Sequence, residues 1–143
     1  MADQAEWFEA FVERVLVEVF EPEEVGQDDD GDYLFGDETA TAYVSVEPEP
    51  QLGVCVWSIA AHQVKASASV LRELNDLNMG ARLAKVIWFG GQVRVVLRLQ
   101  ADQVSVESLA RACGHVQGIT SDIGQLFSAV HGGDSVLAEP QAS

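Results

Sequence analysis

Residues 82–100 read RLAKVIWFGGQVRVVLRLQ, and this stretch decides the fold. Gly90-Gly91 separates two apolar runs, residues 82–89 and 92–100, and a glycine pair in that position is a strong signal for a β-hairpin. Along the second run, apolar side chains alternate with arginines: Val93, Val95, Leu97 and Leu99 against Arg94 and Arg98. The hairpin therefore predicts an antiparallel sheet with one buried face and one polar, cationic outer face.

Upstream of the hairpin, three more strands are predicted at residues 33–36, 39–46 and 52–61. Residues 39–46 alternate cleanly between small apolar and polar side chains, which is typical of a half-buried strand. In residues 52–61 both faces are apolar, with Cys55, Trp57 and Ile59 on one of them. We expect this strand at the centre of a sheet that is covered on two sides.

Three helices accompany these strands, at residues 3–20, 68–78 and 106–130. In the first helix the apolar positions fall within one arc of about 140°: Trp7, Phe8, Phe11, Val12, Val15 and Val19. This arc either packs on the sheet or leaves part of its aromatic surface open for a partner. Ser105 is the predicted N-cap of the last helix, which three glycines weaken.

Together these elements predict a single α+β domain with the order α-βββ-α-ββ-α. Its one antiparallel sheet has about five strands, and the domain spans residues 1–133. Residues 134–143 follow Gly132-Gly133 and are expected to form a disordered tail. A length of 143 residues suits one domain with a core of its own.

The net charge of −15 is confined to the first third of the chain. Residues 1–50 hold 16 Asp and Glu against a single base, Arg14, and residues 51–143 hold equal numbers of acids and bases. Such a surface repels nucleic acid and anionic lipid, so neither is expected as a partner. The acidic N-terminus, without a signal peptide, and the lack of a long apolar stretch predict a cytoplasmic protein.

The residue pattern does not predict an enzyme, a metal site or a cofactor. His62, His115 and His131 are scattered along the chain, and Cys113 and His115 would lie on different faces of a helix. Residues 27–32 resemble a calcium loop only in part, because both ends of that pattern fail, and a solvated turn is favoured. Cys55 and Cys113 are expected to be two buried free thiols, with a structural disulfide as the alternative.

Residues 71–133 carry a family resemblance. The segment LRELNDLN at 71–78, the strand ARLAKV at 81–86, the strand VRVVLRL at 93–99 and the helix from Ser105 to Gly133 are similar to the centre of the YbjN-like family. That family is similar in fold to the type III secretion chaperones. The resemblance implies a small acidic α/β protein, commonly a homodimer, that holds a partner polypeptide, and it implies no catalytic residue.

We therefore expect a chaperone-like protein that binds a peptide or protein client, through apolar surface or by strand addition at a sheet edge. The acidic third would select basic or amphipathic clients. The candidate client-binding residues are Trp7, Phe8, Phe11, Val15, Trp57 and Trp88. The resemblance also implies a dimer, with candidate interface residues Leu71, Leu74, Trp88, Val96, Arg94 and Arg98. The alternative is a regulatory protein that binds one folded partner.

Overall fold

One antiparallel sheet organises the chain in the computed structural model, which describes residues 2–20, 26–27, 31–36, 41–80, 83–131 and 134–135. The strand order is β1-β2-β3-β4-β6-β5, and β7 pairs with the far end of β4. The elements are α1 (Ala2–Val19), β1 (Gly26–Gln27), β2 (Tyr33–Gly36), β3 (Thr41–Glu47), β4 (Gly53–His62), α2 (Ala68–Gly80), β5 (Lys85–Phe89), β6 (Gln92–Gln100), the short 3-10 helix η2 (Ala101–Gln103), α3 (Val106–His131) and β7 (Asp134–Ser135).

The predicted α+β class and the order α-βββ-α-ββ-α are confirmed for the five longer strands. The two-residue strands β1 and β7 were not predicted. Asp134 and Ser135, expected in the tail, pair with His62 and Ala61 of β4, and residues 136–143 lie outside the described part of the chain. The central residues of the proposed calcium loop, 28–30, also lie outside it.

The β5–β6 hairpin forms at the predicted glycine pair. Gly90 and Gly91 have φ angles of 57° and 84°, and a two-residue turn with positive φ at both positions matches the twist of its strands. The hairpin register places Val95 beside Val86 and Arg94 beside Ile87. Apolar residues of β6 thus align with apolar residues of its neighbours on one side of the sheet.

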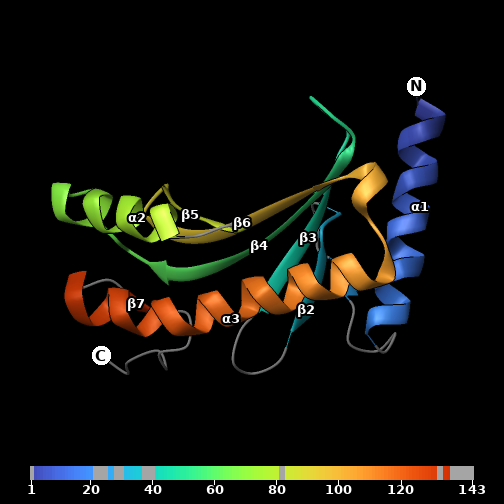
Figure 1. Cartoon of the computed structure of the whole chain (residues 1–143). Coiled ribbons are helices and arrows are strands. Elements are labelled where there is room, and N and C mark those ends of the chain that lie inside the picture. Colours follow the sequence, from blue (N-terminus) through green and yellow to red (C-terminus); the bar gives the residue numbers. More distant parts are fainter. Residues whose placement is uncertain are drawn as a thin grey trace.

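All three helices contribute to a core on one side of this sheet. Phe8 and Leu16 of α1, Leu74 of α2 and Leu109 of α3 belong to one buried cluster. From the sheet that cluster includes Val44, Val54, Val56, Val86, Val93, Val95 and Leu97. Figure 1 shows α3 running along the sheet, with α1 at one end and α2 beside β5 and β6 at the other.

The expectation that helices cover both sides of β4 is wrong for the described residues. β4 is central, between β3 and β6, as predicted. Val54, Val56 and Ser58 face the helices, whereas Trp57 and Ile59 are half-buried on the opposite side. We call that side the open sheet face. The apolar side chains of β4 that face away from the helices are covered only in part, by side chains of neighbouring strands.

Candidate functional site

A trough runs between α2 and α3 on the helix-covered side of the sheet. Its wider part has a volume of about 490 Å³ and an apolar floor. The floor and walls are formed by Leu77, Leu83, Ala84, Val86, Ile119 and Ile123. Leu83 is 60% exposed, so it offers apolar surface at the mouth of the trough.

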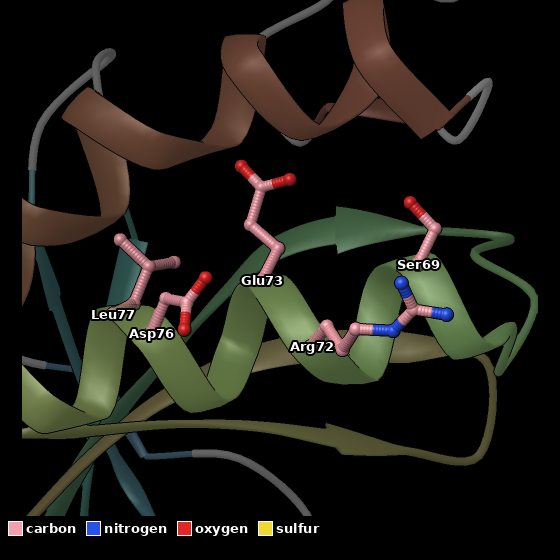
Figure 2. A pocket seen from close by; sticks show the side chains of 5 residues that line it. All are labelled: Ser69, Arg72, Glu73, Asp76 and Leu77. Atoms are coloured by element: carbon pink, nitrogen blue, oxygen red, sulfur yellow. The ribbon is translucent and has the colours of Figure 1, made fainter.

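The trough continues along α2 as a more polar hollow of about 420 Å³. Leu77 lines both parts and so connects them. Figure 2 shows Ser69, Glu73 and Leu77 projecting from α2 toward α3. The charged residues around the two parts are Arg72, Glu73, Asp76 and Asp122, so acids outnumber bases. We call the two parts together the α2–α3 groove.

Hydrogen bonds fix the α2 wall of this groove to the sheet. The side-chain amide of Asn78 donates to the Val86 carbonyl oxygen at 2.8 Å, and its Oδ1 accepts from the Val86 N–H at 2.7 Å. At the start of α2, the Val70 N–H donates to Oγ of Ser67 at 3.1 Å, as an N-cap. Asn78 therefore joins the last turn of α2 to the edge strand β5.

The open sheet face carries a row of four side chains, one from each of four adjacent strands. They are Tyr43 of β3, Trp57 of β4, Arg94 of β6 and Phe89 of β5, and we call them the aromatic–arginine row. Tyr43 stacks on Trp57 with ring centroids 4.3 Å apart. The guanidinium carbon of Arg94 lies 4.9 Å from the ring centroids of both Trp57 and Phe89. Guanidinium groups stack favourably on aromatic faces, so the row is a connected unit.

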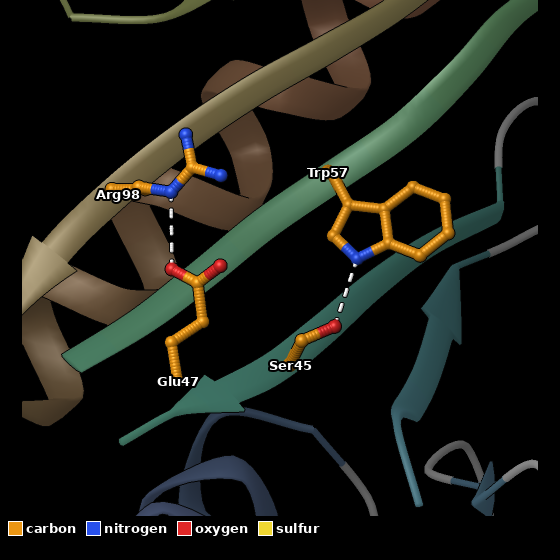
Figure 3. A network of polar contacts seen from close by, with 4 residues as sticks. All are labelled: Ser45, Glu47, Trp57 and Arg98. Carbon is orange, nitrogen blue, oxygen red and sulfur yellow. Dashed lines mark hydrogen bonds and ion pairs between the residues drawn. The ribbon is translucent and has the colours of Figure 1, made fainter. Parts of the chain in front are cut away.

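Polar contacts and buried side chains support this row. Nε1 of Trp57 donates to Oγ of Ser45 at 2.9 Å, and Nε of Arg98 donates to Oε1 of Glu47 at 3.0 Å (Figure 3). The hydrogen bond from Glu47 raises the pKa of Arg98. Below the row, burial raises the pKa of the Cys55 thiol to about 11 against the lowering effect of Arg98. The thiol is therefore neutral at physiological pH.

The predicted client-binding residues of α1 do not form one open surface. Phe8 and Val15 are 1% and 4% exposed and belong to the core, because their part of the helix arc packs on α3 and the sheet. Trp7 is 65% exposed and stacks on half-buried Phe11, with ring centroids 5.6 Å apart. The Trp7–Phe11 pair is the accessible remainder of the predicted aromatic face.

The other two predicted tryptophans lie in different places. Trp57 is in the aromatic–arginine row on the open sheet face. Trp88 is half-buried and packs against the core, and its Nε1 donates to the Val64 carbonyl oxygen at 2.7 Å. Trp88 thus has a structural partner within the chain.

The predicted dimer residues are also divided. Leu74 and Val96 are 5% and 8% exposed, so the folded chain already covers them. Arg94 and Arg98 lie on the open sheet face, whereas Leu71, 49% exposed, projects from a helix that packs with the core on the other side. The accessible members of the set therefore do not form one continuous patch.

Sequence reasoning missed Leu83 and Ile119 in the groove and Tyr43 and Phe89 in the row. The alternation of β3 places Tyr43 opposite to the core, and the same rule pairs Phe89 with Ile87 on β5, so a signal for the row was present. The groove had no comparable signal, because it depends on how far apart α2 and α3 pack.

The two cysteines are free and buried, as predicted. Cys113 lies in the core, where burial raises its pKa to about 12, whereas His115 lines the α2–α3 groove. Within the described residues, no group of three His, Cys, Asp or Glu side chains could hold a metal ion. In the same part of the chain, no helix is both long and apolar enough to span a bilayer.

Comparison with known proteins identifies the family. Curated proteins gave no match to the chain. The profile of one protein family, described as "T3SS (YopN, CesT) and YbjN peptide-binding chaperone 1", matches residues 6–139, which include every helix and strand of the domain. The chain therefore belongs to this family of peptide-binding chaperones of type III secretion and YbjN type.

Proposed function

We propose that the protein is a chaperone-like module that holds an apolar, cation-flanked client segment in the α2–α3 groove. The observation that carries this proposal is the apolar floor of the groove, which is open to solvent at Leu83. Two helices form its walls and β5 contributes to its floor, an arrangement that accepts an amphipathic segment. Membership of a peptide-binding chaperone family supports a binding role over a catalytic one.

Charge indicates which clients fit. Glu73, Asp76 and Asp122 face a client in this groove with Arg72 as the one base among them, and the chain carries a net charge of −15. A client with Lys or Arg beside its apolar residues would gain in association rate and in specificity. Its apolar side chains would bury against Leu77, Leu83 and Ile119, which is the main source of affinity.

Strand addition at β5 is the less favourable route. The N–H and carbonyl of Val86 are already bonded to the side chain of Asn78, so an added strand would have to displace that side chain. The accessible pair Trp7 and Phe11 remains a second candidate contact for a long client.

The test is fluorescence anisotropy with short labelled peptides of alternating Leu and Lys, Leu and Gln, or Leu and Glu. The Leu–Lys peptide should bind most tightly, and Leu83→Asp should weaken it about tenfold by placing a charge at the apolar mouth. Val17→Asp is the matched control, because Val17 is an exposed apolar residue on α1, outside the groove. Equal affinity of wild type and Leu83→Asp would contradict the proposal.

A second arm separates this function from regulation of one folded partner. The protein should bind a permanently reduced, unfolded test protein and not the native form of that same protein. Binding to the native form alone would favour the regulatory alternative.

We also propose that the chain forms a homodimer through the outer surface of α2. Leu71 and Met79 are 49% and 79% exposed and two helical turns apart, so they lie on one stripe of the helix. Light scattering should give a dimeric mass that Leu71→Glu converts to a monomeric one. A monomeric wild type would contradict this assignment and leave the groove proposal intact.

A further inference from the structure

A second binding site lies on the opposite side of the sheet from the groove, and its centre is Arg94. Because β6 lies between β4 and β5, Trp57 and Phe89 flank the Arg94 guanidinium from both neighbouring strands, each at 4.9 Å. Trp57 is itself held by Tyr43 and Ser45. The guanidinium is therefore oriented before any ligand arrives, so little side-chain entropy remains to be lost on binding.

The hydrogen bonds of Arg94 leave its outer nitrogens available. Its Nε donates to Oε1 of Gln92 at 2.8 Å, an interaction that fixes the plane of the group. Within the described part of the chain, no acceptor lies within hydrogen-bond distance of either Nη atom. The fork of N–H donors in a guanidinium matches the two oxygens of a carboxylate. Arg94 thus presents the donor set for an acidic group.

The surroundings of Arg94 are cationic and apolar, unlike the chain as a whole. Arg98 and exposed Lys85 lie on the same face, and the acid near them, Glu47, is paired with Arg98. Ile87 and Phe89 are 40% and 60% exposed beside Arg94. A ligand here meets positive charge and apolar surface together.

We propose that the open sheet face binds an extended peptide segment in which a carboxylate is flanked by apolar side chains. The carboxylate accepts hydrogen bonds from the Nη atoms of Arg94, and the flanking side chains pack on Ile87 and Phe89. Bases of single-stranded nucleic acid also stack on such rings. A net charge of −15 disfavours a polyanion, whereas a short peptide responds mainly to the charges within about 10 Å. This site takes the opposite charge to the α2–α3 groove and does not depend on it.

The experiment measures anisotropy with short labelled peptides of alternating Val and Glu, their Val and Gln counterparts, and a single-stranded RNA oligonucleotide. Each peptide is made with a free and with an amidated C-terminus, which separates a side-chain carboxylate from a terminal one. The Val–Glu peptide should bind at least about tenfold more tightly than the amidated Val–Gln peptide, since hydrogen bonds to charged groups are the stronger ones.

Three variants assign the site. Arg94→Gln should weaken the Val–Glu peptide about tenfold, and Arg94→Lys should weaken it less, because charge is kept while the two-pronged geometry is lost. Lys85→Gln is the matched control, a cation removed from the same face outside the aromatic–arginine row, and should change affinity less than about threefold. Thermal melting of each variant establishes that the sheet is folded.

Three results would overturn the proposal. They are equal affinity for the Glu peptide and the amidated Gln peptide, unchanged affinity in folded Arg94→Gln, and tighter binding of the RNA than of the Val–Glu peptide. Because Leu83→Asp changes only the groove, its effect on the Leu–Lys peptide is read independently of all three.

Discussion

The two sides of the sheet use the same strands for different purposes. On the helix-covered side, Val95 and Leu97 of β6 are buried beneath α2 and α3, and the surface left between these helices is an apolar groove with an acidic rim. On the open side, Arg94 and Arg98 alternate with those same residues and stand among aromatic rings and an ion pair.

This difference shows that net charge alone does not define a binding surface. Most of the acidic residues belong to the first third of the chain, while the open sheet face keeps three cations close together. One strand can serve both sides because its side chains alternate between them. The predictions below test whether the two sides differ as described, from the largest expected effect to the smallest.

The two thiols report on the two sides. Burial raises the pKa of Cys113 in the core from 9.0 to about 12 and that of Cys55, next to Arg98 on the open side, from 9.0 to about 11. Since the thiolate is the reactive form, alkylation should be slower than in the unfolded chain by about 1000-fold for Cys113 and about 100-fold for Cys55. Mass spectrometry after timed iodoacetamide labelling measures both, and Cys113 reacting before Cys55 would contradict the prediction.

The same pKa shifts give a pH dependence. Both thiols hold their protons more tightly in the folded than in the unfolded chain, so their contribution to stability is complete below pH 9.0. It is lost as the pH rises toward about 11 and 12. Urea unfolding across this range should show a shallower decline for Cys113→Ala than for wild type; an identical decline would count against burial as the cause.

Reversing the charge at Arg94 should break the comparison between the two sides. Arg94→Glu places a like charge against an acidic peptide, and affinity for the Val–Glu peptide should fall about 100-fold. Affinity for the Leu–Lys peptide should stay the same or rise, because the α2–α3 groove is unchanged. Anisotropy with both peptides measures this, and a parallel loss for both would mean that they share one site.

Asn78 is expected to fix the α2 wall of the groove. Asn78→Ala leaves the N–H and carbonyl of Val86 without their side-chain partner and should lower the free energy of unfolding by about 2 kcal/mol. Asn75→Ala on the same helix is the control, because Asn75 is exposed and bonds only to the sulfur of Met79, at 3.8 Å. Equal urea midpoints for the two variants would show that the Asn78 bonds contribute little.

Stiffening α3 should have the smallest effect. A Cβ at Gly118 meets nothing within 4 Å, so Gly118→Ala should raise stability by about 0.5–1 kcal/mol through helix propensity. At Gly53 a Cβ would overlap the Leu99 carbonyl oxygen, where β4 and β6 approach closely, so Gly53→Ala should destabilise. Thermal melts compare the two, and a lower melting temperature for Gly118→Ala would contradict the account of α3.

Much of this fold could be predicted because its elements are long and regular. The Gly90-Gly91 turn, the alternation of β3 and the helical period of α3 are each local patterns, and each was recognised. The strands β1 and β7 escaped because two residues carry no period. The number of covered sides was wrong because the half-buried side chains of β4 on the open face are as apolar as those in the core.

The candidate sites were harder to predict than the fold. A helical arc of about 140° does not say which part of it is buried, and the structure buries Phe8 while leaving Trp7 exposed. Leu83 and Ile119 meet only because α2 and α3 pack at a distance from each other, which depends on contacts between distant segments. By contrast, Arg94 was already assigned to a cationic outer face by alternation alone.

The bonds between Asn78 and Val86 have a consequence for the behaviour of the protein at high concentration. An exposed edge strand is a template on which further chains add, and this is a common start of aggregation. The Asn78 side chain occupies that template at Val86 with the donor and acceptor that a neighbouring strand would offer. A protein that keeps other polypeptides from associating is in this way protected, at β5, from associating through its own backbone.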